Sequence, residues 1–314
     1  MKIAKRLIII ALTLAAILTA GGFLAAQFGF FSGGTNAPSV PEDTMTRGLV
    51  GYWSFDEGSG STAYDASGNG NDGTLIHDPK WTQGKSGSAL QFDGVDDYVD
   101  CGNDESLNIT DAITVEAWVK WSAGVNKAIM DKRDEHYANG GKGWMLRGDS
   151  NGIDFAFGNG SDNYWRNNIG TISINEFYHI AVTLYISGTI GTTKIYINGK
   201  EVDSCNHTIV ADLDISNNHS LIIGSYWNTN QSIFNGSIDE VRIYNRALSA
   251  EEVRYHYNHG GPVASWNFDE GSGTVVHDSS GNGFDGVLHE YFLISIICHC
   301  ERSGAIAERS VAIP

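Results

Sequence analysis

The chain has 314 residues, of which 41% are hydrophobic and 11% aromatic, so it can bury one large core or two average ones. Its 38 glycines against 5 prolines indicate many turns between strands and argue against a helical bundle. With 37 acidic residues against 20 Lys and Arg the formal net charge is −17, a balance that repels nucleic acid and excludes DNA- and RNA-binding classes.

Residues 1–31 predict a helix that targets the chain to a membrane. Three basic residues precede an uncharged apolar run over residues 7–31, which is long enough to cross a bilayer as a helix. Its length favours an uncleaved anchor, although small residues leave a cleaved signal peptide open. In either case we expect the rest of the chain outside the cytoplasm, membrane-anchored or secreted. Residues 32–47 are rich in Gly, Pro, Ser and Thr and predict a flexible linker.

Residues 48–259 predict a succession of antiparallel strands. Apolar and polar side chains alternate over residues 113–121, which predicts a half-buried strand with one core-facing side. Asn198 and Gly199 lie between two expected strands and predict a tight hairpin, because this pair readily adopts positive φ angles. One short helix follows, with Ser249 as its N-cap. Many strands with almost no helix predict an all-β fold, a two-sheet antiparallel sandwich.

The opening segment of this domain occurs a second time. Residues 50–75 and 263–288, offset by 213, agree at 16 of 26 positions. A period this long indicates tandem whole domains and not the units of a solenoid. The residues that follow the second copy match nothing in the first. We therefore expect a truncated second domain over residues 263–290 and a disordered tail over residues 291–314.

Several segments, in order, resemble LamG-like jelly-roll domains of the concanavalin A-like lectin/glucanase superfamily. They are WSFDEGSG, SALQFDGVDDYV, ITVEAWVKW, IYINGKEV and FNGSIDEVRIYNRALSAEEV, and they span residues 48–259. The resemblance implies a jelly roll of two sheets packed face to face, often with a calcium ion near one edge and a glycan or protein ligand on the concave side or rim. Because this fold hosts lectins, adhesins and hydrolases, function has to be argued from the site.

A polar loop is the first candidate calcium site. It places oxygen donors at alternate positions, with a further carboxylate after a glycine, like the first half of a calcium loop. These donors are Asp65, Ser67, Asn69 and Asp72. The bidentate acid expected at position 12 of such a loop is missing, since Ile76 stands there. A tight turn in which Asp and Asn bond their own backbone is the alternative.

Asp56 and Asp239 are the second candidate calcium site. They lie in the first and last strands, which commonly run side by side in a sandwich, and two carboxylates brought together repel unless a cation or an arginine such as Arg242 compensates them. Surface carboxylates that hold loops are the alternative. The acidic loop with Asp93, Asp96 and Asp97 is more typical of a solvated turn than of a site.

Aromatic residues near asparagines are candidate glycan-binding residues, because carbohydrate sites combine an aromatic face with amide hydrogen bonds. The aromatic candidates are Trp144, Tyr164, Trp165, Tyr226 and Trp227, and the amides are Asn163, Asn167 and Asn228. The alternative is packing in the core, where aromatic side chains dominate sandwich interiors.

The sequence does not favour an enzyme. Hydrolases of this fold place two carboxylates in alternation on one strand, whereas Glu116 is alone on its strand and the adjacent Asp239 and Glu240 point to opposite faces. We expect a non-catalytic binding module for carbohydrate or extracellular protein, with calcium as a structural cofactor, no nucleic-acid partner, and membrane contact through the N-terminal helix only. The alternatives are a structural or adhesive cell-surface repeat protein and, less favoured, a glycoside hydrolase.

Overall fold

The computed structural model describes residues 42–122, 127–134, 141–149, 152–209, 213–226 and 232–258, together with parts of 266–287. The chain divides into two compact units, residues 1–41 and 42–314, and all described residues belong to the second. The predicted N-terminal helix, most of the linker and the tail after residue 287 lie outside the described residues. Within the described part, no helix is both long and apolar enough to cross a bilayer.

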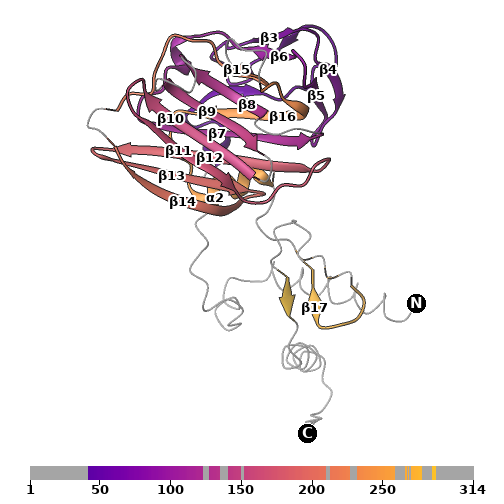
Figure 1. The fold of residues 1–314 in the computed structure, drawn as a ribbon. Coiled ribbons are helices and arrows are strands. Elements are labelled where there is room, and N and C mark those ends of the chain that lie inside the picture. The colour runs from indigo at the N-terminus through magenta and orange to yellow at the C-terminus, as the bar shows by residue number, and fades with distance from the viewer. Residues whose placement is uncertain are drawn as a thin grey trace, which may run out of the picture. The chain divides into compact units, whose positions relative to one another are not determined.

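The described domain is an all-β sandwich of two eight-stranded sheets, as predicted (Figure 1). Sheet A contains, in order, β14 (Lys200–Thr208), β13 (Ile190–Ile197), β12 (Phe177–Ser187), β7 (Ala112–Trp121), β16 (Asn235–Tyr244), β5 (Ser88–Asp93) and β4 (Lys80–Gln83), and β1 (Leu49–Trp53) also pairs with β16. Sheet B contains, in order, β11 (Asn163–Ile169), β10 (Gly152–Asn159), β9 (Lys142–Asp149), β8 (Lys127–Arg133), β15 (Ile222–Ile223), β6 (Tyr98–Asp100), β3 (Gly73–Ile76) and β2 (Thr62–Ala63).

Every described strand pair is antiparallel. The helical elements are η1 (Glu42–Met45), η2 (Glu105–Leu107) and α2 (Ala250–Tyr257), and a separate two-stranded sheet pairs β17 (Val275–Val276) with β18 (Gly286–Val287). The predicted hairpin joins β13 to β14, with φ of 50° at Asn198 and 72° at Gly199. The predicted N-cap is also confirmed, since Ser249 and Glu252 form a capping box at the start of α2.

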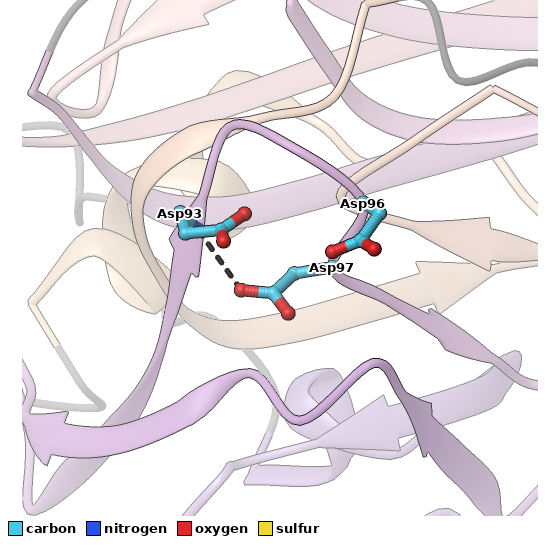
Figure 2. Close-up of side chains that lie close together, drawn as sticks. All are labelled: Asp93, Asp96 and Asp97. Atoms are coloured by element: carbon cyan, nitrogen blue, oxygen red, sulfur yellow. Dashed lines mark hydrogen bonds between the residues drawn. The ribbon is translucent and has the colours of Figure 1, made fainter.

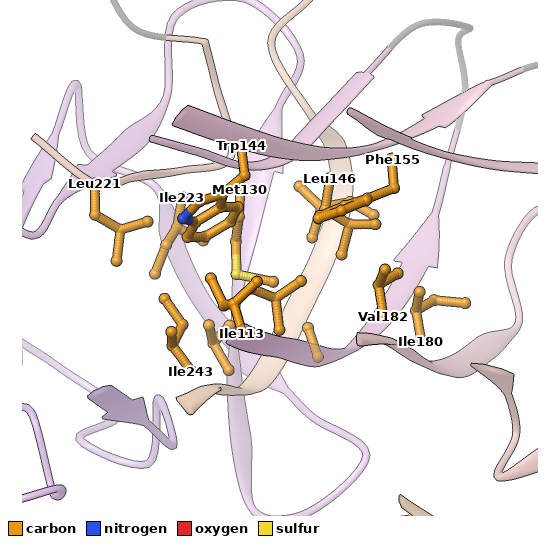
Figure 3. Packing of buried hydrophobic residues seen from close by; sticks show 14 of the residues in the cluster. Ile113, Met130, Trp144, Leu146, Phe155, Ile180, Val182, Leu221, Ile223 and Ile243 are labelled. Atoms are coloured by element: carbon orange, nitrogen blue, oxygen red, sulfur yellow. The ribbon is translucent and has the colours of Figure 1, made fainter. Parts of the chain in front are cut away.

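The inner faces of the two sheets meet in one hydrophobic core (Figure 3). Sheet A contributes Ile113, Ile180, Val182 and Ile243, and sheet B contributes Met130, Trp144, Leu146, Phe155 and Ile223. These side chains come from alternate positions of their strands, so the neighbouring residues face away from the core. Burial of this apolar surface is the main force that holds the sheets together.

Strand β7 differs from its prediction, because both of its faces are buried. The outer face carries Glu116 and Trp118, and α2 packs over it. Tyr257 of α2 stacks on Trp118 with ring centroids 5.4 Å apart. A helix that follows the last strand therefore covers part of the face that alternation alone would assign to solvent.

Candidate functional site

The face of sheet B that points away from the core carries a group of aromatic and charged side chains. Met145 of β9 pairs with Ala156 of β10, and Ala156 pairs with Trp165 of β11. Tyr226 packs on Met145 and Ala156, and the partly buried Trp165 lies against the same group. We call Met145, Ala156, Trp165 and Tyr226, with Arg147 of β9, the Trp165 cluster.

Arg147 holds the Trp165 cluster together. Its Nε and Nη2 donate to Oδ2 of the buried Asp154, at 2.8 and 2.6 Å, and its Nη1 donates to the Tyr226 hydroxyl at 3.3 Å. Its guanidinium carbon lies 5.3 Å from the centroid of the Trp165 ring. An arginine fixed on both sides in this way holds the indole in one place.

A second ion pair borders the cluster. Arg133 of β8 donates from Nε to Oδ1 of Asp131 at 2.9 Å, and its guanidinium carbon lies 5.7 Å from the centroid of the Tyr226 ring. Each of the two arginines therefore has a carboxylate of its own. The four charged groups cancel, and this face of sheet B gains no net charge from them.

Two of the predicted glycan-binding aromatics lie in this cluster. Trp165 is partly exposed on it, whereas Tyr226 is buried and supports it through the hydrogen bond from Arg147. Asn163 lies two residues before Trp165 in β11, so it shares the same face of the strand, and its side chain is exposed. Asn167 is exposed in the same strand.

The other predicted aromatics lie elsewhere. Trp144 is buried in the core, which corrects its assignment as a ligand contact: its position in β9 is the inward one, since its neighbour Met145 faces outward. Tyr164 packs against the core and stacks on Phe157, with ring centroids 5.1 Å apart. Trp227 lies outside the described residues, as does Asn228.

The loop with the first candidate calcium site is closed by its own hydrogen bonds. The backbone amides of Tyr52 and Ser67 donate to Oδ1 of Asp65, each at 2.9 Å, and the Ser67 hydroxyl donates to Oδ2 at 2.8 Å. Oδ1 of Asp72 accepts from the Asp65 amide, and the Asn69 side chain donates to the carbonyl of Leu49. These contacts are those of a tight polar turn. Metal binding by this loop stays a prediction.

The structure brings Asp56 and Asp239 to one loop, the connection between β4 and β5. Oδ2 of Asp239 accepts from the amides of Lys85 and Ser86, at 2.7 and 3.1 Å, and Oδ1 of Asp56 accepts from the amide of Ser88 at 2.8 Å. Asp239 is fully buried, and its Oδ1 has no hydrogen-bond donor among the described groups. Orphaned carboxylate oxygens of this kind are rare in folded proteins and call for an explanation.

The pKa of Asp239 also shows that its carboxylate is poorly compensated. Burial, with repulsion from Glu240 and Asp56, raises the pKa of Asp239 to about 7, against the opposing effect of the two amides. The sequence suggested that Arg242 compensates this pair. The structure shows instead that Arg242 pairs with Glu240 and lies 3.9 Å from Glu116. Carboxylate oxygens are the hard donors that calcium prefers, and Oδ1 of Asp239 is one that has no hydrogen-bond donor among the described groups.

Asp93, Asp96 and Asp97 converge in the turn between β5 and β6 (Figure 2). One carboxylate oxygen from each of the three residues lies within 4.8 Å of the other two. The Asp93 amide donates to Oδ2 of Asp97 at 3.0 Å, and Oδ1 of Asp93 accepts from the amide of Val95 at 2.7 Å. Burial raises the pKa of Asp97. Contacts of this kind are typical of an Asx turn.

A buried cluster that the sequence did not predict lies beneath α2. Oε1 of Glu116 is 3.0 Å from Nδ1 of His256, and Oε2 is 3.7 Å from Nε2 of His179. Arg242 of β16 lies 3.9 Å away on the same side of sheet A. Burial would raise the pKa of Glu116, but His256, His179 and Arg242 together lower it to about 2. Glu116 is thus buried beneath the helix.

A family model described as the concanavalin A-like lectin/glucanases superfamily matches residues 93–254. The match covers just over half of the chain, so the chain belongs to this family. No curated protein matches it.

Solved structures share the fold at low sequence identity. The binding domain of Paraclostridial Mosquitocidal Protein 1 has a TM-score of 0.55 at 19% identity, over 70% of this chain and 56% of that one. Domain 4 of AbnA, a GH43 extracellular arabinanase from Geobacillus stearothermophilus in complex with arabinotriose, has a TM-score of 0.50 at 24% identity, over 66% and 96%. A structure of botulinum neurotoxin type C, whose cell entry depends on two ganglioside molecules, has a TM-score of 0.51 at 18% identity, over 69% and 52%. The chain thus spans about half of the two toxin structures and nearly all of the arabinanase domain.

Proposed function

We propose that the chain is a non-catalytic carbohydrate-binding module that contacts its glycan through the Trp165 cluster. The observation that carries this proposal is a partly exposed tryptophan on the face of sheet B that points away from the core, with its ring against Arg147 of the Arg147–Asp154 ion pair. A flat indole face offers apolar contact to a sugar ring, and the exposed Asn163 and Asn167 offer hydrogen bonds to its hydroxyls.

Preorganisation supports this assignment. The ion pair and the buried Tyr226 fix Arg147, and Arg147 fixes the indole, so little side-chain entropy remains to be lost when a ligand binds. The arabinanase domain in complex with arabinotriose shares the fold along almost its whole length. That likeness is compatible with a glycan ligand.

We propose calcium as a structural cofactor held by Asp56 and Asp239. The ion would neutralise the two carboxylates and satisfy the orphaned Oδ1 of Asp239. Asp239 already connects β16 to the β4–β5 loop through its other oxygen. We also propose that the domain lies outside the cytoplasm, because the apolar run over residues 7–31 follows a basic N-terminus.

Binding of the purified full-length chain to a panel of neutral and acidic oligosaccharides tests the proposed function. We expect at least one neutral glycan to bind, with the tryptophan fluorescence of the chain perturbed on binding. Binding that persists unchanged when Trp165 is replaced by Ala would contradict the proposed site. Absence of binding to every glycan in the panel would contradict the function itself.

A further inference from the structure

The described residues of the second copy of the opening segment adopt the same local structure as their counterparts in the first. β17 pairs with β18 in the register in which β2 pairs with β3, with every partner displaced by the repeat offset of 213. The partners are Val275 with Val287 and Val276 with Gly286, and their counterparts are Thr62 with Thr74 and Ala63 with Gly73.

The backbone before the hairpin is repeated as well. Phe268 has a φ of 58° and its counterpart Phe55 a φ of 57°, a left-handed conformation that is uncommon for a bulky residue. Oε1 of Glu270 accepts from the amide of His277 at 2.7 Å, and Oε1 of Glu57 accepts from the amide of Tyr64 at the same distance. An uncommon backbone angle and a side-chain-to-backbone hydrogen bond across seven residues both recur, which indicates the same folded element.

The two copies differ in what covers their apolar side chains. Trp53 and Phe55 are fully buried in the core of the sandwich. Their counterparts Trp266 and Phe268 are 44% and 67% exposed. The paired positions Thr62 and Thr74 of the first copy are occupied in the second by Val275 and Val287. The two valines are 41% and 63% exposed, although exposed positions favour polar side chains over apolar ones. The second copy therefore exposes four large apolar side chains to solvent.

The surface complementary to this hairpin is known from the first copy. In the sandwich, Trp53 of β1 pairs with Val241 of β16, and Leu75 of β3 pairs with Val99 of β6. A segment with the same register and with aromatic residues at the same positions fits the same site. Each chain thus carries one described site of this kind and two segments that match it.

We propose that residues 263–287 are a docking element that inserts into the opening-strand site of a second copy of this chain. Insertion would pair its strands with β16 and β6 of that copy, in place of the copy's own β1 and β3, in a form of strand addition. The resident segment has the advantage of being tethered next to its site, which keeps exchange rare in the unmodified protein. Because donor and site lie on different parts of the chain, exchange is heterologous and links copies head to tail.

Weakening the resident segment in the full-length chain tests this. The double variant Trp53→Ala/Phe55→Ala should remain folded by circular dichroism and form assemblies whose mass rises with concentration in light scattering. Adding Trp266→Asp and Phe268→Asp should abolish both the assemblies and the folding. A folded monomer of the first variant, or equal loss of folding with and without the second pair of changes, would overturn the proposal.

Disulfide trapping gives an answer that does not depend on the folding of that variant. Thr74 of the resident segment lies opposite Asp100, so its counterpart Val287 should lie opposite Asp100 of another copy after exchange. A copy with Val287→Cys mixed with a copy with Asp100→Cys should give a cross-linked dimer on oxidation, in amounts that rise with protein concentration. The pair Thr74→Cys/Asp100→Cys within one chain is the positive control. A control that cross-links while the mixed copies do not would overturn the exchange.

Discussion

Trp165 is the side chain on which the proposed function depends most, because it is the partly exposed aromatic residue of its cluster. Replacing it with Ala removes the apolar platform but leaves the Arg147–Asp154 pair in place. We expect glycan affinity to fall at least tenfold, about 1.4 kcal/mol or more, in isothermal titration calorimetry. Tyr185→Ala is the matched control, since Tyr185 is half-exposed on sheet A, and it should bind as the unmodified chain does.

Glu116 is expected to stabilise the fold in a pH-dependent manner. Its pKa is lowered to about 2 from an ordinary value of 4.5, so its contribution is fully present above about pH 4.5 and is lost as the pH falls toward 2. Glu116→Gln should therefore lower the free energy of unfolding by roughly 3 kcal/mol at pH 7, and by much less near pH 2.5. Urea unfolding at both pH values measures this, with the exposed Glu105→Gln as control. Equal destabilisation at both pH values would show that the charge is not what matters.

The sequence predicted some of these residues and misplaced others for reasons of geometry. Tyr164 and Trp165 are adjacent in β11, and adjacent side chains in a strand point to opposite faces, so at most one of them could face outward. Alternation alone did not say which one. The Glu116 cluster could not be predicted, because it joins residues of β7, β12, β16 and α2 that only the topology brings together.

At the scale of elements, α2 is held at its N-terminus by a capping box. The Ser249 hydroxyl accepts from the amide of Glu252 at 3.2 Å, and the Ser249 amide donates to Oε2 of Glu252 at 2.8 Å. Ser249→Ala should lower the free energy of unfolding by about 1 kcal/mol, measured by chemical denaturation. Ser204→Ala, in the exposed edge strand β14, should change it far less.

The β4–β5 loop and β16 are the elements that the proposed calcium ion joins. Added calcium should raise the melting temperature of the chain and excess EDTA should lower it, because the ion satisfies Asp239 only in the folded state. Asp239→Asn should remove this response. Asp93→Asn, in the acidic turn between β5 and β6, should keep it. A calcium response lost only in the Asp93 variant would move the site to that turn.

Local patterns predicted single elements of the fold. The β13–β14 hairpin and the start of α2 were predicted because Asn-Gly and Ser-x-x-Glu determine the backbone over a few residues. The burial of both faces of β7 was not, because it depends on where α2 packs after the last strand of the sandwich has formed. Contacts of that kind are set by tertiary structure and leave no periodic signal in one segment.

At the scale of the whole molecule, charge determines which glycans can approach. The chain has a formal net charge of −17, which repels acidic polysaccharides. Arg133 and Arg147 do not counter this at the proposed site, since Asp131 and Asp154 already neutralise them.

We therefore expect neutral glycans to bind with affinities that change less than about twofold between about 50 and 500 mM NaCl, because an uncharged ligand has no charge–charge interaction with the protein that salt could screen. Sialylated or uronate-containing analogues of the same glycans should bind more weakly at low salt. Asp154→Asn leaves Arg147 without its carboxylate, and it should shift the preference toward the acidic analogues if the ion pair sets the selectivity. Tight, salt-sensitive binding of an acidic glycan by the unmodified chain would contradict this reading while leaving the proposed function intact.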